Sequence, residues 1–352
     1  MSLTKLDIDR FISTLRTKSK EFNSITNVQL ASMLEETISN INEVAYFWAT
    51  ICSDNKGTTK TPAEGEEWVG GPYAAVLATQ YYRDTLIDDS DLNEDKYNEK
   101  ENSYSVFPNN LIERISFPFV NAKVLFNKSM SFDDINKYRG FSKRYDIDPS
   151  ITLVLGAGNY SSIPYLDVMY HLVTRRSVIL LKLNPVNEYL KPVFEKVFQN
   201  FIERGYIIVT TGSIDESKYM TKHPGVNHIH LTGSDKTYED IVYGRELSVN
   251  DKKVKQLQKI NNKPITSELG NVTPIIIHPG KWSTSDIKYQ ARKIVTGKLN
   301  NNGFNCISAQ VVVLPDGWGH TDTLIKYIKH YMNTIKDLSL IHISEPTRRV
   351  FI

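Results

Sequence analysis

A strand, a helix and a second strand follow one another between residues 151 and 182, and this order strongly limits how the chain can fold. Residues 151–155 are β-branched and apolar and end at Gly156-Ala-Gly158, and residues 178–181 form a second apolar run. The segment between them carries apolar residues at the spacing i, i+3, i+4, i+7 of an amphipathic helix, namely Leu166, Met169, Tyr170 and Val173. Strands joined by a helical crossover run parallel. The segment therefore predicts a βαβ unit.

The same alternation continues toward the C-terminus. Apolar runs predict further strands at 206–209, 226–231, 274–277 and 310–314. Helical periodicity predicts helices over 190–201 and 285–299. Repeated βα units favour a largely parallel sheet that is covered on both faces. Residues 1–145 are more polar and show helix-like spacings, so we expect a helical N-terminal region there.

Charge and cysteine content exclude several classes of protein. The chain has 352 residues, with 42 Lys and Arg against 40 Asp and Glu, and this net charge of +2 leaves no basic surplus for nucleic acid or an anionic membrane. Cys52 and Cys306 are its two cysteines, which is too few for a disulfide framework or a thiolate metal cage. We find neither a signal peptide nor an apolar run that could span a bilayer. The expected protein is cytoplasmic, with no nucleic-acid partner and no membrane span.

Residues 338–352 differ in character from the rest of the chain. Leu338 to Arg348 match, codon by codon, the in-frame translation of a transposase adapter used in sequencing libraries. A genuine C-terminal strand and turn is the alternative. We predict that the natural sequence ends near Asp337 and that residues 338–352 are a non-native tail.

Three features could carry chemistry, and each also has a structural explanation. Gly156 to Ser161 begins like the dinucleotide motif G-x-G-x-x-G, but Ser161 stands where the third glycine belongs. Its place at the carboxyl end of a strand is where open parallel sheets bind ligands. Cys306, in a polar turn, is a nucleophile or a small buried hydrophobe. Glu268 is a general base or an ordinary surface carboxylate.

Two histidines and a lysine have simpler interpretations. His228 and His230 share one strand face, but only His223 lies near them in sequence, so we expect structural or solvated histidines and no metal site. Lys182 follows four apolar residues and could extend its ammonium group from a strand end into water.

Taken in order, these pieces resemble the aldehyde dehydrogenase superfamily, most strongly a bacterial-type branch. The resemblance runs from Ile151 to Trp318. Its motifs stand in this chain as Gly158-Asn159, Leu181-Lys182-Leu-Asn-Pro185, Leu231-Thr-Gly-Ser234, Glu268-Leu-Gly270 and Gly303-Phe-Asn-Cys306. It implies an α/β fold with a Rossmann-like parallel-sheet cofactor domain and an incomplete α/β catalytic domain. With the tail, the expected domains are a helical region 1–145, a dinucleotide-binding domain 146–267, a catalytic fragment 268–337 and the non-native residues 338–352.

The resemblance also implies a reaction and roles for three residues. An aldehyde would be oxidised to a carboxylic acid through a cysteine thiohemiacetal and thioester, with NAD or NADP as acceptor. Cys306 would be the nucleophile, Asn159 the amide donor to the oxyanion, and Glu268 the base that activates water. If coenzyme A resolved the thioester instead, the protein would be an acylating dehydrogenase or acyl-CoA reductase; an inactive dinucleotide-binding fragment is the third alternative.

Cofactor contacts follow from the same resemblance. The implied residues are Lys182 for the adenosine ribose, together with Gly158, Thr232, Gly233, Ser234, Leu269 and Gly270. The turn at Thr232-Gly233-Ser234 would let a pyrophosphate approach a helix N-terminus, whereas an ordinary helix cap at Ser234 is the alternative. Pro185 stands where NAD-preferring relatives often carry Glu, so the choice between NAD and NADP stays open.

The sequence departs from the family at three points. Asn271 replaces a usual glycine, and the interval from Glu268 to Cys306 is somewhat longer than is usual. A later cofactor-contact motif and the C-terminal oligomerisation strand have no counterpart before Asp337. We therefore expect the 352-residue chain to have little or no activity, and its full-length parent to be a homo-oligomer that acts on a small-molecule aldehyde.

Overall fold

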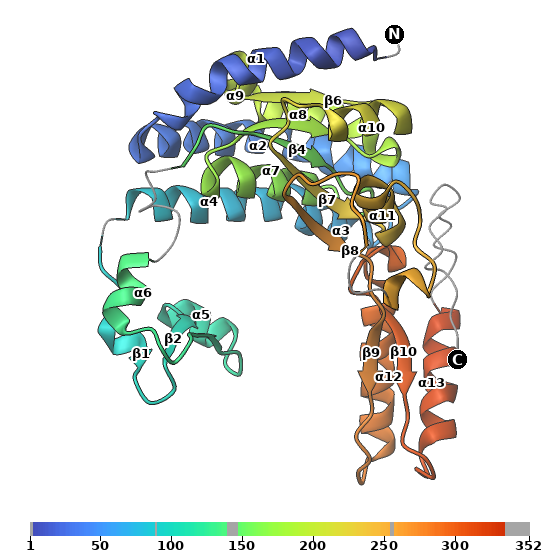
Figure 1. Cartoon of the computed structure of the whole chain (residues 1–352). Helices are drawn as coiled ribbons and strands as arrows, with labels where there is room; N and C mark the ends of the chain where they lie inside the picture. Colours follow the sequence, from blue (N-terminus) through green and yellow to red (C-terminus); the bar gives the residue numbers. More distant parts are fainter. Residues whose placement is uncertain (1–2, 89, 139–146, 254–256, 335–352) are drawn as a thin grey trace.

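A five-stranded parallel sheet forms the centre of the molecule (Figure 1). The structure is a computed structural model that describes residues 3–88, 90–138, 147–253 and 257–334. The strands lie in the order β6-β5-β4-β7-β8, and every neighbouring pair is parallel. Their bounds are β4 Ile151–Leu155, β5 Val178–Lys182, β6 Ile207–Thr210, β7 His228–Gly233 and β8 Ile265–Leu269. The strand order reverses at β4, and the predicted parallel sheet is confirmed.

Helices cover both faces of this sheet. α7 packs against β4, β5 and β7, while α1 packs against β4, β5 and β6. Every side chain of β4 and β5 is buried, as expected of strands that are covered on both sides. The helices of this part are α1 Lys5–Asn23, α7 Ile163–Thr174, α8 Lys191–Val197, α9 Gln199–Glu203, α10 Ile214–Lys222 and α11 Asp235–Tyr243.

The N-terminal region is helical as predicted over its first 87 residues. It continues after α1 with α2 Asn27–Lys56, α3 Glu64–Trp68, a π-helical turn Val69–Tyr73 and α4 Ala74–Ile87. Thr4 and Thr26 form capping boxes at the starts of α1 and α2. α2 packs against α4 and α8, and its Trp48 is fully buried and donates its indole N–H to the Ser161 hydroxyl at 2.9 Å. These helices therefore extend the main core.

Residues 97–138 contain strands that the prediction of a helical N-terminal region missed. They form a three-stranded antiparallel sheet with two short helices, a separate lobe that is clearest in Figure 1. Its elements are β1 Tyr97–Asn98, β2 Ser103–Phe107, α5 Leu111–Ser116, β3 Ala122–Leu125 and α6 Phe132–Tyr138. All four residues of β3 are exposed, so no alternation of buried and exposed positions marks it.

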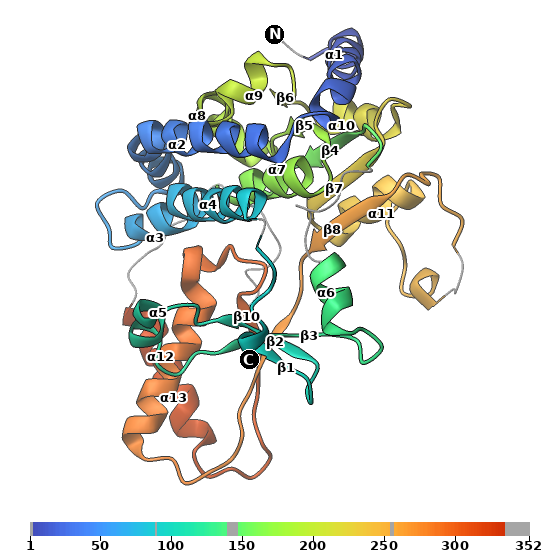
Figure 2. The same ribbon diagram turned by 90° about the vertical axis from the view of Figure 1, so that its left-hand side faces the viewer.

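The last described residues form a second, smaller unit that projects from the five-stranded sheet (Figure 2). β9 Thr273–Ile276 and β10 Ala309–Val313 pair in parallel, next to α12 Thr284–Leu299 and α13 Thr321–Thr334. The predicted strands at 274–277 and 310–314 and the helix at 285–299 are confirmed. The predicted tail, 338–352, lies outside the described residues. Within the described ranges, no helix is long and apolar enough to cross a bilayer.

Candidate active site

A cleft of about 450 Å³ opens at the carboxyl ends of β4, β5 and β7, beside the point where the strand order reverses. Open α/β sheets bind their ligands at this place. Four of the residues predicted to contact a cofactor line it, namely Lys182, Thr232, Gly233 and Ser234. Gly158, Leu269 and Gly270 are not among the lining residues; Leu269 packs against the main core and Gly270 is exposed.

Lys182 ends β5 at the floor of this cleft. Its side chain is buried, and burial lowers the pKa of its ammonium group, while Glu188 and Glu216 act in the opposite direction. The other two lysines of the cleft wall, Lys218 and Lys236, each have a carboxylate within 4 Å, at 3.1 and 3.2 Å. In the described part of the chain Lys182 has no such carboxylate, which leaves its charge available to an anionic ligand.

Gly158 is explained by close packing of the loop after β4. A Cβ atom added there would lie 2.9 Å from Cγ of Asn184, closer than real Cβ contacts. The Asn187 amide donates to the carbonyl of Ala157 at 3.2 Å, which fixes the same loop from the other side. Gly158 therefore shapes the rim of the cleft without lining it.

The turn after β7 is held by a cap on α11 and by a carboxylate of α7. Ser234 caps α11 by accepting from the backbone N–H of Thr237 at 3.2 Å, so the cap predicted as an alternative is present. The Thr232 hydroxyl donates to Asp167 of α7 at 2.9 Å. Nε2 of His230 lies 3.2 Å from the other carboxylate oxygen of Asp167. The turn is thus anchored to α7.

His230 and His171 lie beside each other next to this turn, with their ring centroids 4.9 Å apart. Nδ1 of His230 lies 2.8 Å from the Thr266 hydroxyl on β8. His171 of α7 is fully buried, and neither of its ring nitrogens has a hydrogen-bond partner. Burial, reinforced by the neighbouring His230, Arg175 and His228, lowers the pKa of His171 to about 3, so its ring is neutral. Among the described residues, no three His, Cys, Asp or Glu side chains are arranged to hold a metal ion.

Cys306 lies in a loop that follows α12, half-buried, with its sulfur 3.8 Å from Oδ1 of Asn305. The loop begins with a 3-10 turn, Asn300–Gly303, in which three consecutive residues have positive φ. Oδ1 of Asn300 accepts from the Asn305 amide at 3.1 Å. We call residues 300–306 the nucleophile loop, after the role predicted for Cys306.

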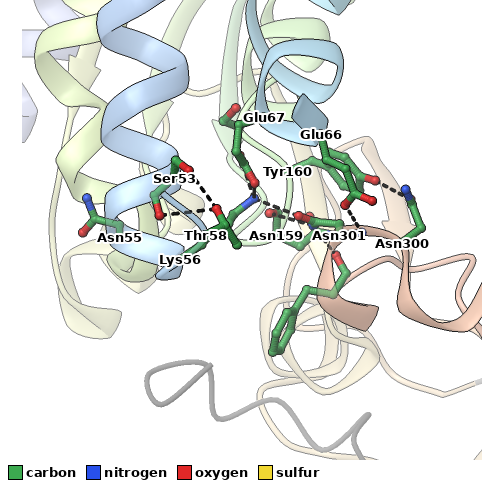
Figure 3. A network of polar contacts seen from close by, with 12 residues as sticks. Ser53, Asn55, Lys56, Thr58, Glu66, Glu67, Asn159, Tyr160, Asn300 and Asn301 are labelled. Carbon is green, nitrogen blue, oxygen red and sulfur yellow. Dashed lines mark hydrogen bonds and ion pairs between the residues drawn. The ribbon is translucent and has the colours of Figure 1, made fainter. Parts of the chain in front are cut away.

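The nucleophile loop and the loop that carries Asn159 are in direct contact (Figure 3). The Asn301 amide donates to the backbone carbonyl of Asn159 at 3.2 Å, and the Tyr160 hydroxyl donates to Oδ1 of Asn300 at 2.6 Å. Burial, with the charges of Glu66 and Glu67, raises the pKa of Tyr160 to about 12, so the phenol stays protonated as a donor. Two of the three predicted catalytic positions therefore lie on adjoining loops.

The Tyr160 ring is fixed from the opposite side by the backbone of the π-helical turn. A Cβ added to Gly70 would lie 2.6 Å from the ring, and the Gly70 carbonyl accepts from the Ser162 N–H at 3.2 Å. The backbone of the N-terminal helices thus lies directly against the Asn159 loop.

Glu268, the third predicted catalytic residue, is not joined to this pair. It belongs to β8 rather than following the strand, its register partner is Thr232, and its side chain is exposed. In the described ranges no hydrogen bond connects it to the nucleophile loop. It is paired with the first residue of the turn 232–234, but it is not among the residues that line the cleft.

Sequence reasoning missed the residues that hold the nucleophile loop. Lys56 and Glu67 are buried beneath it, and Lys56 donates to Oδ1 of Asn301, which lies 245 positions later in the chain. No local pattern could reveal that contact. The run of asparagines before Gly303 was a usable signal, since Asn tolerates positive φ better than most residues.

Comparison with known proteins agrees with this fold. Residues 169–338 match the sequence model described as Aldehyde dehydrogenase family. No curated protein matches the chain.

Among solved structures, the chain is similar to a 3,6-anhydro-L-galactose dehydrogenase, with a TM-score of 0.63 and 14% identity over 99% of this chain and 59% of that one. A glyceraldehyde-3-phosphate dehydrogenase from Methanocaldococcus jannaschii, complexed with NADP, gives 0.63 and 15% over 95% and 60%. An acetylating aldehyde dehydrogenase from Geobacillus thermoglucosidasius gives 0.55 and 12% over 93% and 58%.

At such identities these similarities establish the fold. The chain spans somewhat less than two thirds of the length of each of the three solved structures. The family match covers the second half of α7 through α13, and the shared fold extends over the N-terminal helices as well. The chain thus resembles the aldehyde dehydrogenase family, in sequence over residues 169–338 and in fold over almost its whole length.

Proposed function

We propose that this chain carries the cofactor cleft and the nucleophile of an enzyme that oxidises an aldehyde to a carboxylic acid with NAD or NADP. The observation that carries the proposal is the direct contact between the nucleophile loop and the Asn159 loop, at the edge of the sheet where the cleft opens. The match of residues 169–338 to the Aldehyde dehydrogenase family supports the same reaction.

Cys306 is the proposed nucleophile. Its thiolate attacks the aldehyde carbon, and the carbonyl oxygen becomes the oxyanion of a thiohemiacetal. Its half-buried position leaves the sulfur reachable, in contrast to Cys52, which is fully buried and whose pKa burial raises to about 11. Of the two thiols, only Cys306 suits nucleophilic chemistry.

Asn159 is the proposed donor to the oxyanion. Its backbone carbonyl accepts from the Asn301 amide, and its own side-chain amide has no hydrogen-bond partner among the residues that the structure describes. A positioned amide of this kind contributes about 3–4 kcal/mol to transition-state stabilisation in other enzymes. Collapse of the oxyanion expels hydride and leaves an acyl thioester on Cys306.

The residues of the cleft fit a nicotinamide dinucleotide, which when bound accepts the hydride. Lys182 offers a cation that has no carboxylate partner within the described ranges. The turn 232–234 precedes the N-terminus of α11, where backbone N–H groups and the helix dipole favour phosphate. The structures that this one resembles include complexes with NADP and with NAD⁺. The same unpaired lysine would suit a 2′-phosphate.

Two fates of the thioester are proposed. In the first, Glu268 deprotonates a water that hydrolyses it to the carboxylate. In the second, coenzyme A takes the acyl group, and two observations favour keeping this alternative: Glu268 is not joined to the nucleophile loop, and one similar structure is an acetylating aldehyde dehydrogenase.

The test compares the 352-residue chain with a longer protein in which residues 1–337 continue into a natural C-terminal sequence, here called the uninterrupted reading frame. Both are assayed on an aldehyde panel with NAD⁺ and NADP⁺, with and without coenzyme A. The uninterrupted frame is expected to form NAD(P)H, and the 352-residue chain to bind NAD(P)H with little or no turnover. Accumulation of acyl-CoA would select the second fate.

Two variants assign the roles. Cys306→Ala should abolish NAD(P)H formation while cofactor affinity changes less than about twofold, because Cys306 does not line the cleft. Glu268→Gln should retain a burst of one NAD(P)H per site and then stall. Undiminished oxidation by Cys306→Ala would refute the covalent mechanism.

A further inference from the structure

A buried ion pair lies beneath the nucleophile loop, and no step of the proposed reaction uses it. Nζ of Lys56, the last residue of α2, lies 2.8 and 3.0 Å from the two carboxylate oxygens of Glu67 in α3. The two side chains are only 6% and 5% exposed. Burying two charges is costly, and apolar replacement of such a pair is often neutral or stabilising. Stability alone therefore gives a weak reason for this pair.

The third hydrogen bond of Lys56 leaves the N-terminal helices. Nζ donates to Oδ1 of Asn301 at 2.9 Å, so all three N–H groups of the ammonium have acceptors within the protein (Figure 3). The neighbouring Glu66 accepts from the backbone N–H of Asn301 at 2.6 Å. Glu66 and Lys56 thus both contact Asn301, and Glu67 acts on it through Lys56.

Asn301 passes this constraint to both parts of the active site. Its amide donates to the carbonyl of Asn159 at 3.2 Å and to that of Phe304, two residues before Cys306, at 2.8 Å. The side chain is almost fully buried. It is therefore a junction between the proposed oxyanion donor and the proposed nucleophile.

The backbone of the nucleophile loop needs such external support. Asn301, Asn302 and Gly303 have φ values of 51°, 56° and 80°. Non-glycine residues in the left-handed region cost free energy, and two in succession persist only when surrounding contacts hold them. Lys56 and Glu66 supply those contacts from outside the loop's own unit.

We propose that Lys56 is a positioning residue, which, held by Glu67, fixes Asn301 and thereby sets the distance between the Cys306 nucleophile and the Asn159 donor. The inference rests on the proposed function and deepens it, because it gives the N-terminal helices a part in the reaction. An ångström of misplacement at a reacting centre can cost about a hundredfold in rate.

Hydrogen exchange of the 352-residue chain tests the tether without requiring turnover. In Lys56→Met, amide exchange in residues 300–308 should accelerate at least about tenfold, because the loop loses its outside support. Cys52, one turn earlier in α2, should resist alkylation as in the wild type, which shows that the helices remain folded. The matched control is Lys123→Met, which breaks an exposed pair with Glu101 at 2.8 Å and should leave the loop unchanged.

A double variant separates positioning from stability. In Lys56→Met/Glu67→Met both charges are gone, so the thermal midpoint should return toward the wild-type value, while exchange in the loop stays fast. In the uninterrupted reading frame the same double variant should keep kcat about ten- to a hundredfold low, with the NAD(P)H dissociation constant within about twofold of wild type.

Two results would overturn the inference: wild-type exchange of the loop in Lys56→Met, or recovery of both loop exchange and kcat in the double variant. Failure of the proposed function is a different result, because it appears as a wild-type reading frame that oxidises no aldehyde, whatever the exchange data show.

Discussion

The five-stranded sheet and the two-stranded sheet arise from the same alternation of strand and helix, yet they are covered very differently. In β4 and β5 every side chain is buried, whereas β9 and β10 alternate, with Ile276 74% and Val313 45% exposed. The smaller unit's own buried cluster contains only five residues, Ile277, Ile287, Ala291, Ile294 and Leu324. The cleft is thus built on a large core, and the nucleophile loop on a small one.

This difference explains why contacts from distant elements matter at the nucleophile loop. The turn 232–234 is anchored within the larger unit, because Asp167 of α7 contacts both Thr232 and His230. The nucleophile loop instead depends on Lys56 and Glu66, which belong to the N-terminal helices. The nucleophile loop, which is built on a small core, is therefore held in place by the N-terminal helices.

The largest loss of stability is expected from a substitution at the centre of the five-stranded sheet. Leu180 of β5 is fully buried, so Leu180→Ala should lower the free energy of unfolding by about 2–5 kcal/mol through lost burial and a residual cavity. Urea unfolding followed by circular dichroism measures it. A loss below about 1 kcal/mol would contradict close packing around the buried Leu180 side chain.

A smaller effect should depend on pH. The folded state holds His171 neutral with a pKa of about 3, whereas the histidine of the unfolded chain has the ordinary pKa of 6.5. The free energy of unfolding therefore falls as the pH falls from 6.5 toward 3, because only the unfolded chain binds the proton there. Between about pH 7.5 and about pH 5 this group alone should cost roughly 2 kcal/mol.

His171→Leu removes that titration. Its loss of stability over the same pH interval should be smaller than that of the wild type by the same amount, measured by urea unfolding at the two pH values. Equal acid sensitivity of the two proteins would show that His171 is not held neutral.

A comparable or smaller change in free energy is expected for nucleotide binding in the cleft. Lys182→Met keeps the apolar stem of the side chain but removes its cation, so NADPH affinity should fall about tenfold, or roughly 1.4 kcal/mol, and NADH affinity less. Fluorescence titration of the nucleotide measures both. A matched variant, Lys218→Met, removes a cleft lysine that is already paired with Asp240 and should change affinity little.

The smallest change in stability is expected for a substitution in the two-stranded sheet. Ile276→Ala removes a largely exposed side chain and should change the free energy of unfolding by less than about 0.5 kcal/mol. Urea unfolding at two protein concentrations tests this. A loss above about 1 kcal/mol that grows with concentration would mean that another copy of the chain covers β9.

Much of the larger unit could be predicted from the sequence, because its strands are short apolar runs that end at Gly-rich turns and alternate with amphipathic helices. The resemblance to a known family, rather than these patterns, assigned Lys182, Thr232 and Ser234 to one cofactor site, and all three line the cleft. The strands of residues 97–125 gave no such signal, since β1 has two residues and β3 is exposed throughout. The contact of Lys56 with Asn301 joins positions 245 apart, and periodicity carries no information at that range.

Gly70 has a mechanical consequence for the reaction. Because no methyl group fits between its Cα and the ring of Tyr160, an alanine at this position would act as a wedge that tilts the phenol, and the phenol in turn holds Asn300. If Cys306 has the proposed role, one added carbon atom at Gly70 slows the reaction although it does not contact the Cys306 sulfur. Substitution of Gly70 would then change the rate without changing the residues that line the cleft.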